Sequence, residues 1–528
     1  MTTAQRIPSG VVLAALAAGG ACTMSIELAA VRVLAPWFGT SQAVWTNVIG
    51  VILVALSTGY LIGARLSSGP TPLRRLGIAL LGAAFFTATV PFQAERVARW
   101  FLPHGLALDE AATLLHWGSL AAALVMFLPP ALILGLCPPL GAEALQRARL
   151  ASAGAIGGVV LAVSTLGSLV GTFATTYWAI PTFGLRATFA ACAAVLAILG
   201  IGLCWIEQRR AIAIGGAIGM ALTCVVESPA VSMPSGHRLL EARESRYQSV
   251  RVVETEELGA PTRKLQVNEG LDSFQSVWRP EPGLLPPGYY YNYFAPPAWL
   301  SPRAQRWRVL VLGLGAGTAW RVLDGALPPG CRLESDGVEI DGAIVQLGQR
   351  WMDLPGSRAE LRAWGDWDGR AALVGLPGPY DQIVLDAYAN QTEIPAHMAS
   401  VEFFREVARR LAPGGWISIN VGGFGLDDPV VRAVAETAAE ALSARVLAIS
   451  VPFSRNCMIY ARRGAELPDP AEGAWTTGEA RIDALLAPCA IPGTYGFFTP
   501  GGDAVLYDDR NDVERRQRTS LARGKTLP

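Results

Sequence analysis

The hydrophobic pattern divides the chain in two near residue 227. Before that point seven apolar stretches contain no Asp, Glu, Lys or Arg; they cover residues 7–26, 33–64, 76–94, 111–142, 150–185, 187–206 and 211–226. A helix needs roughly 20 apolar residues to cross the hydrocarbon core of a bilayer. The pattern therefore predicts an all-α polytopic membrane domain of about seven helices over residues 1–227, in contact with a lipid bilayer. The alternative, a large soluble helical core, would not repeat charge-free stretches of this length.

Arginines between the stretches indicate the orientation of the helices. Most lie in the loops of one side, at Arg6, Arg65, Arg74, Arg75, Arg147, Arg149, Arg209 and Arg210, whereas the other loops hold mainly Arg96, Arg99 and Arg186. By the positive-inside rule the N-terminus is cytoplasmic, and seven crossings would place everything after residue 227 outside. Nucleotide-type substrates are made inside the cell, which favours the opposite side. The sequence predicts a multi-pass protein of a bacterial-type inner membrane and leaves the side of its second half open.

Small residues recur within the fifth stretch. Gly167 and Gly171 form a Gly-x-x-x-Gly pair, a spacing that lets two membrane helices approach closely. We expect these glycines to mark a helix–helix contact.

After residue 227 the pattern changes to short strands and amphipathic helices. Residues 228–306 hold a linker at 228–235 and two alternating segments, 247–254 and 262–267, which predict an antiparallel hairpin. Residues 307–528 alternate strands with helices; strands are expected at 308–314, 332–340, 360–364, 380–386 and 415–421, with 446–451 and 456–462 as a closing hairpin. This order predicts an α/β Rossmann-like domain of the methyltransferase type, which binds ligands at the carboxyl ends of its strands.

Three glycines follow the first of these strands, where a doubly wound sheet brings its backbone close to a nucleotide. They are Gly313, Gly315 and Gly317; Glu339 ends the next strand and Asp366 follows the third. Together they predict contacts to one adenosine: the glycine backbone beside its amino-acid portion, Glu339 on the ribose hydroxyls and Asp366 on the adenine amine. A sulfonium nucleoside is favoured over NAD. Each residue alone also fits a strand-end turn or a helix cap.

Composition argues against several other classes of function. The formal net charge is zero, so no basic surface predicts binding to nucleic acid. The eight cysteines and four histidines are dispersed without zinc or redox spacing, so no metal site is predicted. A small-molecule substrate is the expected partner of the α/β domain, and no separate cofactor is expected.

Several segments resemble the spermidine synthases, which are polyamine aminopropyltransferases. The likeness is carried by 244–248 (Glu-Ser-Arg-Tyr-Gln), the glycine loop, 338–341 (Val-Glu-Ile-Asp), 380–386 (Tyr-Asp-Gln-Ile-Val-Leu-Asp) and 411–415 (Leu-Ala-Pro-Gly-Gly), in the family's order and spacing. Segments 164–168, 180–184 and 507–510 resemble transmembrane spermidine synthase-like proteins. The resemblance covers most of the chain.

The resemblance implies transfer of an aminopropyl group from decarboxylated S-adenosylmethionine to a polyamine, with release of methylthioadenosine. It implies that Asp386 accepts a proton from the attacking amine, help worth about 10²–10⁴-fold in rate, and that Gln248 faces the donor. Asp386 alone also fits a helix cap or a strand-end turn. We further expect a homo-oligomer.

Two positions depart from the family's pattern. Ala316 replaces the glycine-loop acid that holds the donor's terminal amine, and Ala389 replaces the second acid of the loop that begins at Asp386. Lost charge-assisted hydrogen bonds usually cost kcal/mol each, so weak dependence on a polyamine is expected. Ala316 also removes an acid that would repel the carboxylate of intact S-adenosylmethionine. A lyase that forms methylthioadenosine and homoserine lactone is therefore an alternative.

Aromatic residues gather in segment 289–293, which includes Tyr291, and recur at Tyr388. They predict a cage that favours a cation, or alternatively a packed hydrophobic lid. A methyltransferase and a membrane protein that only senses or transports a nucleoside remain further alternatives.

Overall fold

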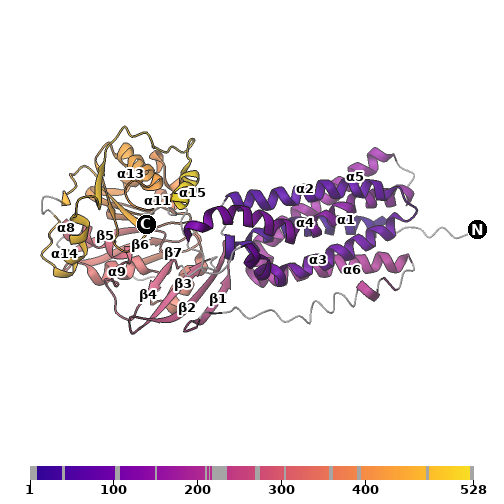
Figure 1. Cartoon of the computed structure of the whole chain (residues 1–528), viewed down its shortest axis with the longest axis horizontal. Helices are drawn as coiled ribbons and strands as arrows, with labels where there is room; N and C mark the ends of the chain where they lie inside the picture. The colour runs from indigo at the N-terminus through magenta and orange to yellow at the C-terminus, as the bar shows by residue number, and fades with distance from the viewer. Residues whose placement is uncertain are drawn as a thin grey trace, which may run out of the picture.

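The computed structural model describes residues 9–38, 42–101, 108–148, 152–207, 211–212, 214–216, 233, 235–267, 274–301, 305–355, 361–388, 394–470 and 475–523. A bundle of long helices forms one end of the elongated molecule, and the strands and shorter helices form the other (Figure 1). The N-terminal half is thus helical and the C-terminal half α/β, as predicted.

Six long helices form the bundle in the described part of the chain: α1 (Ser9–Phe38), α2 (Gln42–Ser67), α3 (Pro72–Phe101), α4 (Leu108–Ala148), α5 (Ala153–Ala174) and α6 (Ile180–Ile206). Five segments are long and apolar enough to cross a membrane, with 153–206 counted as one. The count of seven is therefore too high for the described residues. Of the seventh predicted stretch, 211–226, only 211–212 and 214–216 are described, and these are helical.

Segment 153–206 is bent because α5 passes through the π-helical turn η1 (Thr175–Ala179) into α6, where Gly184 has a φ of 78°. That left-handed φ is accessible to glycine at little steric cost. The bend lies at the end of the bundle beside the α/β half, and α6 ends at the opposite end (Figure 1). The predicted linker at 228–235 lies almost wholly outside the described residues.

Close contact between α1 and α5 explains the Gly-x-x-x-Gly pair. A Cβ atom at Gly167 would lie 2.0 Å from the Ala17 carbonyl oxygen, and one at Gly171 would lie 2.2 Å from that of Ala21. Ser168 adds a hydrogen bond from its hydroxyl to the Gly20 carbonyl, 3.2 Å long. The two helices therefore meet backbone to backbone, as the spacing predicts.

A four-stranded antiparallel sheet opens the second half, in the order β1 (Arg238–Glu244), β2 (Ser249–Glu257), β3 (Ala260–Val267) and β4 (Ser276–Trp278). The predicted hairpin is the pair β2 and β3, and its register joins Val250 to Val267. Val252 and Leu265 of these strands are buried together with Ile344 of α10 (Gly342–Trp351). The small sheet thus packs on a helix of the larger domain.

The larger sheet has eight strands in the order β12-β10-β11-β9-β8-β5-β6-β7. Its parallel strands are β5 (Arg306–Leu312), β6 (Arg332–Val338), β7 (Leu361–Trp364), β8 (Tyr380–Leu385) and β9 (Leu411–Gly422). The antiparallel strands are β10 (Val446–Ser450), β11 (Asn456–Arg462) and β12 (Tyr495–Phe498). All seven predicted strands are present, whereas β12 was not predicted.

Helices cover both faces of this sheet, so its strands are apolar on both sides. Leu310 and Leu312 of β5 pack in the core that includes α12 (Val401–Arg410) and α13 (Pro429–Leu442). Val309 and Val311 face the opposite core, with α9 (Thr318–Ala326) and α14 (Ala480–Leu486). This burial on both faces is typical of parallel sheets. The fold class is as predicted.

We predict that Gly171→Val weakens the bundle. The new side chain would meet the backbone of α1, and overpacking of this kind costs about 1–3 kcal/mol or more. The apparent Tm of the detergent-solubilised protein should fall. Gly157→Val is the matched control on the same helix, because a Cβ atom there meets nothing within 4 Å. Equal Tm values for the two variants would contradict the close packing.

Candidate functional site

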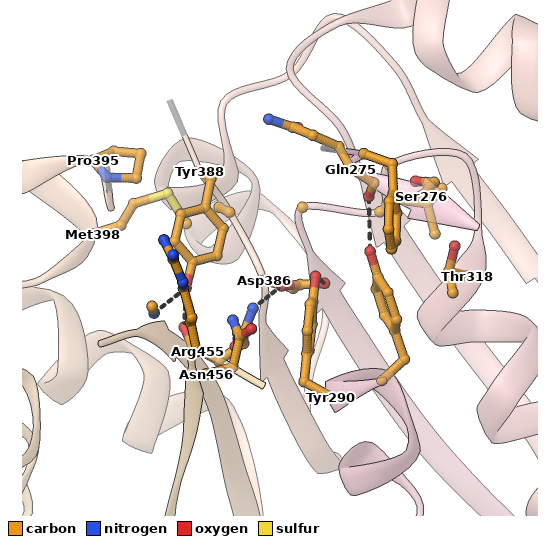
Figure 2. Close-up of a pocket in the computed structure, with 18 of the residues that line it drawn as sticks. Gln275, Ser276, Tyr290, Thr318, Asp386, Tyr388, Pro395, Met398, Arg455 and Asn456 are labelled. Atoms are coloured by element: carbon orange, nitrogen blue, oxygen red, sulfur yellow. Dashed lines mark hydrogen bonds between the residues drawn. The ribbon is translucent and has the colours of Figure 1, made fainter. Parts of the chain in front are cut away.

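A cavity of about 840 Å³ lies at the carboxyl ends of β5, β6, β8 and β9. Most of the predicted site residues line it: Gln248, Gly313, Gly315, Glu339, Asp386, Tyr388 and Tyr291. Figure 2 shows the end of the cavity that holds Asp386, between the tyrosines of one wall and Tyr388 of the other. Strands far apart in sequence thus bring these side chains to one place, as expected for a doubly wound sheet.

The glycine loop between β5 and α9 passes directly over the end of β8. A Cβ atom at Gly313, whose φ is +89°, would lie 2.3 Å from the Asp386 carbonyl oxygen, so this position requires glycine. The Gly313 amide donates to the Val338 carbonyl at 3.0 Å. Gly317 precedes the first turn of α9 in a left-handed conformation. It shapes the loop but does not line the cavity.

Glu339 lies just after β6 and is held by the backbone. Its carboxylate accepts the amide of Gly315 at 2.9 Å and that of Asp341 at 3.2 Å. Burial raises the pKa of Glu339 to about 7, although these two donors favour its charged form. Glu339 therefore connects the glycine loop to the end of β6 and presents a carboxylate to the cavity.

Asp386 lies directly after β8 at the floor of the cavity. It accepts hydrogen bonds from the Asn420 amide nitrogen at 2.9 Å and from the Tyr290 hydroxyl at 3.2 Å. Burial raises its pKa to about 7; the two donors lower it, and the charge of Glu339 raises it. A carboxylate with such a pKa exchanges a proton readily near neutral pH, as a general base must.

Aromatic rings enclose Asp386. Tyr290 and Tyr291, both in the turn η2 (Tyr290–Phe294), stack with ring centroids 4.1 Å apart. The Tyr388 hydroxyl donates to the Asn420 carbonyl at 2.8 Å and accepts the Gly422 amide at 3.0 Å. Burial raises the pKa of Tyr290 and Tyr388 well above the ordinary value, so both stay neutral. These rings line the cavity, and Tyr291 is also buried in the adjacent hydrophobic core. The cation cage stays a prediction.

Asp366 lies beside the cavity, near enough for its charge to act on Asp341 and Tyr247. It is exposed, has a φ of 57°, and does not line the cavity. A Cβ atom at Gly342 would lie 2.5 Å from its carboxylate, so Asp366 lies against the start of α10. Asp368, which pairs with His397 at 2.9 Å, lines the cavity instead. Contact between Asp366 and an adenine amine stays a prediction.

The two residues that depart from the spermidine synthase pattern are Ala316 and Ala389, and the structure describes only the first. Ala316 is buried, and its amide donates to the Ser276 hydroxyl at 2.9 Å. Ala389 lies outside the described residues. The described wall beyond Tyr388 includes Arg455, whose guanidinium carbon lies 5.2 Å from the centre of the Phe424 ring. This wall thus carries a cation beside an aromatic ring.

Comparison with known proteins supports the family. No family model matches the chain. A probable polyamine aminopropyl transferase of Bifidobacterium longum is 32% identical over 191 residues, which are 36% of this chain and 40% of that relative. A polyamine aminopropyltransferase of Mycobacterium tuberculosis is 25% identical over 446 residues, 78% of this chain and 77% of the relative. This chain is spermidine synthase-like.

The longer alignment covers so much of the chain that it must include part of the helical bundle. Among solved structures, a probable spermidine synthase from Corynebacterium glutamicum has a TM-score of 0.41 at 20% identity, over 51% of this chain and 96% of that chain. The match to the first relative spans less than half of that protein's length.

Sequence reasoning missed three polar residues of the spermidine synthase-like site. Asn420, at the end of β9, donates to Asp386. Asn456 donates to the Asn420 side-chain oxygen at 2.8 Å. The backbone carbonyl of Gln275 accepts the Tyr291 hydroxyl at 2.9 Å. A signal existed for Asn420, since it is a polar residue near the carboxyl end of a largely apolar buried strand. The other two contacts depend on tertiary packing.

We predict that Glu339→Ala weakens binding of methylthioadenosine and of S-adenosylmethionine alike. A lost charge-assisted hydrogen bond to a ribose hydroxyl costs about 1.5–3 kcal/mol. Calorimetry with the full-length protein checks this, and Glu334→Ala near the amino end of β6, where the glutamate side chain is 42% exposed, is the control. Wild-type affinity in Glu339→Ala would remove Glu339 from the nucleoside site.

Proposed function

We propose that the protein is a membrane-associated aminopropyltransferase. It cleaves the propyl-side C–S bond of decarboxylated S-adenosylmethionine, transfers the aminopropyl group to a polyamine and releases methylthioadenosine. The observation that carries this proposal is Asp386: a carboxylate at the floor of an aromatic cavity, with a pKa of about 7. Glu339 and the glycine loop supply the nucleoside side of the same cavity.

The proposed reaction is a direct displacement. The lone pair of a neutral amine forms a bond to the carbon beside the sulfonium, the C–S bond breaks, and its electron pair stays on sulfur. The attacking nitrogen gives up a proton to the Asp386 carboxylate. Asn420 and Tyr290 hold that carboxylate in place, and the neutral tyrosine rings favour a cationic substrate.

A lyase reaction on the same site is the second candidate. In it, the carboxylate of intact S-adenosylmethionine attacks the carbon beside sulfur, so homoserine lactone and methylthioadenosine form without an acceptor. Two observations favour it. Ala316 removes an acid that would repel that carboxylate, and Arg455 places a cation in the cavity wall. The curated relatives favour transfer, since their names describe polyamine aminopropyl transfer.

The products distinguish these functions. Purified full-length protein is incubated with decarboxylated or intact S-adenosylmethionine, with and without putrescine, and the products are identified by mass. Methylthioadenosine with spermidine supports transfer, methylthioadenosine with homoserine lactone supports the lyase, and S-adenosylhomocysteine would indicate a methyltransferase. Binding of a nucleoside without any product would indicate a sensor.

Asp386→Asn is predicted to abolish most turnover while it preserves the fold. The amide keeps the size of the side chain but removes its charge and its capacity as a base, so turnover should fall at least about 10²-fold. Affinity for methylthioadenosine should stay within a few-fold of wild type. Full activity in this variant would exclude Asp386 from both proposed reactions.

The pH dependence of transfer should follow Asp386. A raised pKa means that the base is protonated below about pH 7 and becomes available as pH rises, so kcat/KM should rise through that range. Asn420→Ala removes a donor that favours the charged form, so the pKa of Asp386 should rise and the profile should move to higher pH by about 1 unit. Wild type and Asn420→Ala act on the same substrate amine, so the titration of that amine cannot produce a difference between their pH profiles. An unmoved profile would contradict the assignment of the base.

A further inference from the structure

Helix α1 of the bundle contacts the α/β half directly. Arg32 lies in the last two turns of α1, and its Nη1 atom donates to the Ser245 carbonyl oxygen at 2.6 Å, across 213 positions of sequence. Its charge is also close enough to act on the carboxylates of Glu244 and Asp341. Arg32 therefore binds the turn between β1 and β2, which contains the motif at 244–248.

That turn is part of a buried network. The Ser245 hydroxyl donates to the Asp341 carboxylate at 2.6 Å and accepts the amides of Tyr247 and Gln248, each at 3.0 Å. The Gln248 side chain also forms a hydrogen bond with Asp341. Ser245 is buried. A displacement of its backbone would therefore move the side chain that fixes Asp341.

Asp341 connects the turn to the nucleoside site. Its amide donates to the Glu339 carboxylate at 3.2 Å, and its own carboxylate accepts the Ala343 amide at 3.0 Å at the start of α10. The other oxygen of Glu339 accepts the Gly315 amide. A continuous series of contacts thus leads from Arg32 through Ser245 and Asp341 to Glu339.

A second helix supports the same point. The bend of α6 at Gly184 lies beside Glu244, whose Cγ atom would be 3.7 Å from a Cβ atom on that glycine. Burial raises the pKa of Glu244, and the positive charge of Arg32 acts in the opposite direction. Removing Arg32 would leave a half-buried carboxyl without that compensating charge, which favours rearrangement of the turn.

We infer that Arg32 is a positioning residue through which the helical bundle sets the affinity of the nucleoside site. This inference rests on the proposed function, because it takes the nucleoside to bind at Glu339. Since coupling between two sites is reciprocal, occupancy of the nucleoside site also stabilises the end of α1 against the turn. The membrane half then contributes to the free energy of substrate binding as well as anchoring the protein.

The test uses full-length protein in lipid nanodiscs with three substitutions. Arg32→Met keeps most of the side-chain volume but removes the charge and the donors; Arg32→Lys keeps the charge. Arg99→Met is the control, since this exposed arginine pairs with Glu95 on the same helix. Calorimetry measures the Kd of methylthioadenosine, and kinetics measures KM and kcat for decarboxylated S-adenosylmethionine.

Arg32→Met should raise Kd and KM at least fivefold and leave kcat within twofold, because Asp386 and Asn420 are not part of the network. Arg32→Lys should recover part of the loss, and Arg99→Met should equal wild type. A wild-type Kd in Arg32→Met, or an equal loss in Arg99→Met, would overturn the inference. So would a fall in kcat at unchanged KM.

Hydrogen exchange on the wild-type protein provides a test that needs no variant. Methylthioadenosine should slow amide exchange in 243–249 and at the end of α1, around Arg32, but not at the opposite end of that helix. Protection confined to the α/β half would overturn the inference and leave the proposed function intact. If the wild-type protein binds no methylthioadenosine, the proposed function fails, and this inference fails with it.

Discussion

The approach of the glycine loop to the end of β8 is the constraint on which the rest of the site depends. Gly313 passes so close to the Asp386 carbonyl that a Cβ atom would overlap it. Because β5 lies between β6 and β8 in the sheet, this contact places a loop backbone, Glu339 and Asp386 around one cavity. Burial of two carboxylates is unfavourable unless donors compensate. The Gly315 amide and the Asn420 side chain supply part of that compensation.

Much of this arrangement was predictable because it follows from local patterns. An apolar strand followed by glycines, and acids at successive strand ends, are signals contained within a few residues, and the parallel order of the sheet converts them into a common site. The bundle was predictable for a similar reason, since a charge-free apolar stretch long enough to cross a bilayer rarely occurs in a soluble fold. The seventh helix is different: it falls on the connection to β1, where few residues are described.

What escaped prediction depends on contacts between distant segments. Tyr290 reaches Asp386 from a turn about a hundred residues earlier, and nothing in the tyrosine-rich segment says which ring would do so. The exposure of Asp366 arises from a left-handed residue after a short strand, a detail that a strand-end rule does not include. Arg32 is the clearest case. In the sequence it is, with Glu27, one of two charged residues in a long apolar helix, and only the tertiary structure shows its partner in the turn between β1 and β2.

Both halves of the molecule contain ionisable side chains that are partly or fully buried and need compensating partners. The base proposed at Asp386 must be able to lose and regain a proton, and among the described residues the donors to its carboxylate, Asn420 and Tyr290, are both neutral. An arginine in their place would lower its pKa too far for a base. At the junction of the halves a cation compensates the carboxylate instead, because Arg32 lies beside Glu244 and donates to the Ser245 carbonyl. The apolar helix α1 gains from this contact as well, since a guanidinium near its end is satisfied by protein. The same contact that makes an arginine tolerable in α1 also holds the turn whose Ser245 hydroxyl donates to Asp341, so one interaction joins the bundle to the residues behind the proposed nucleoside site.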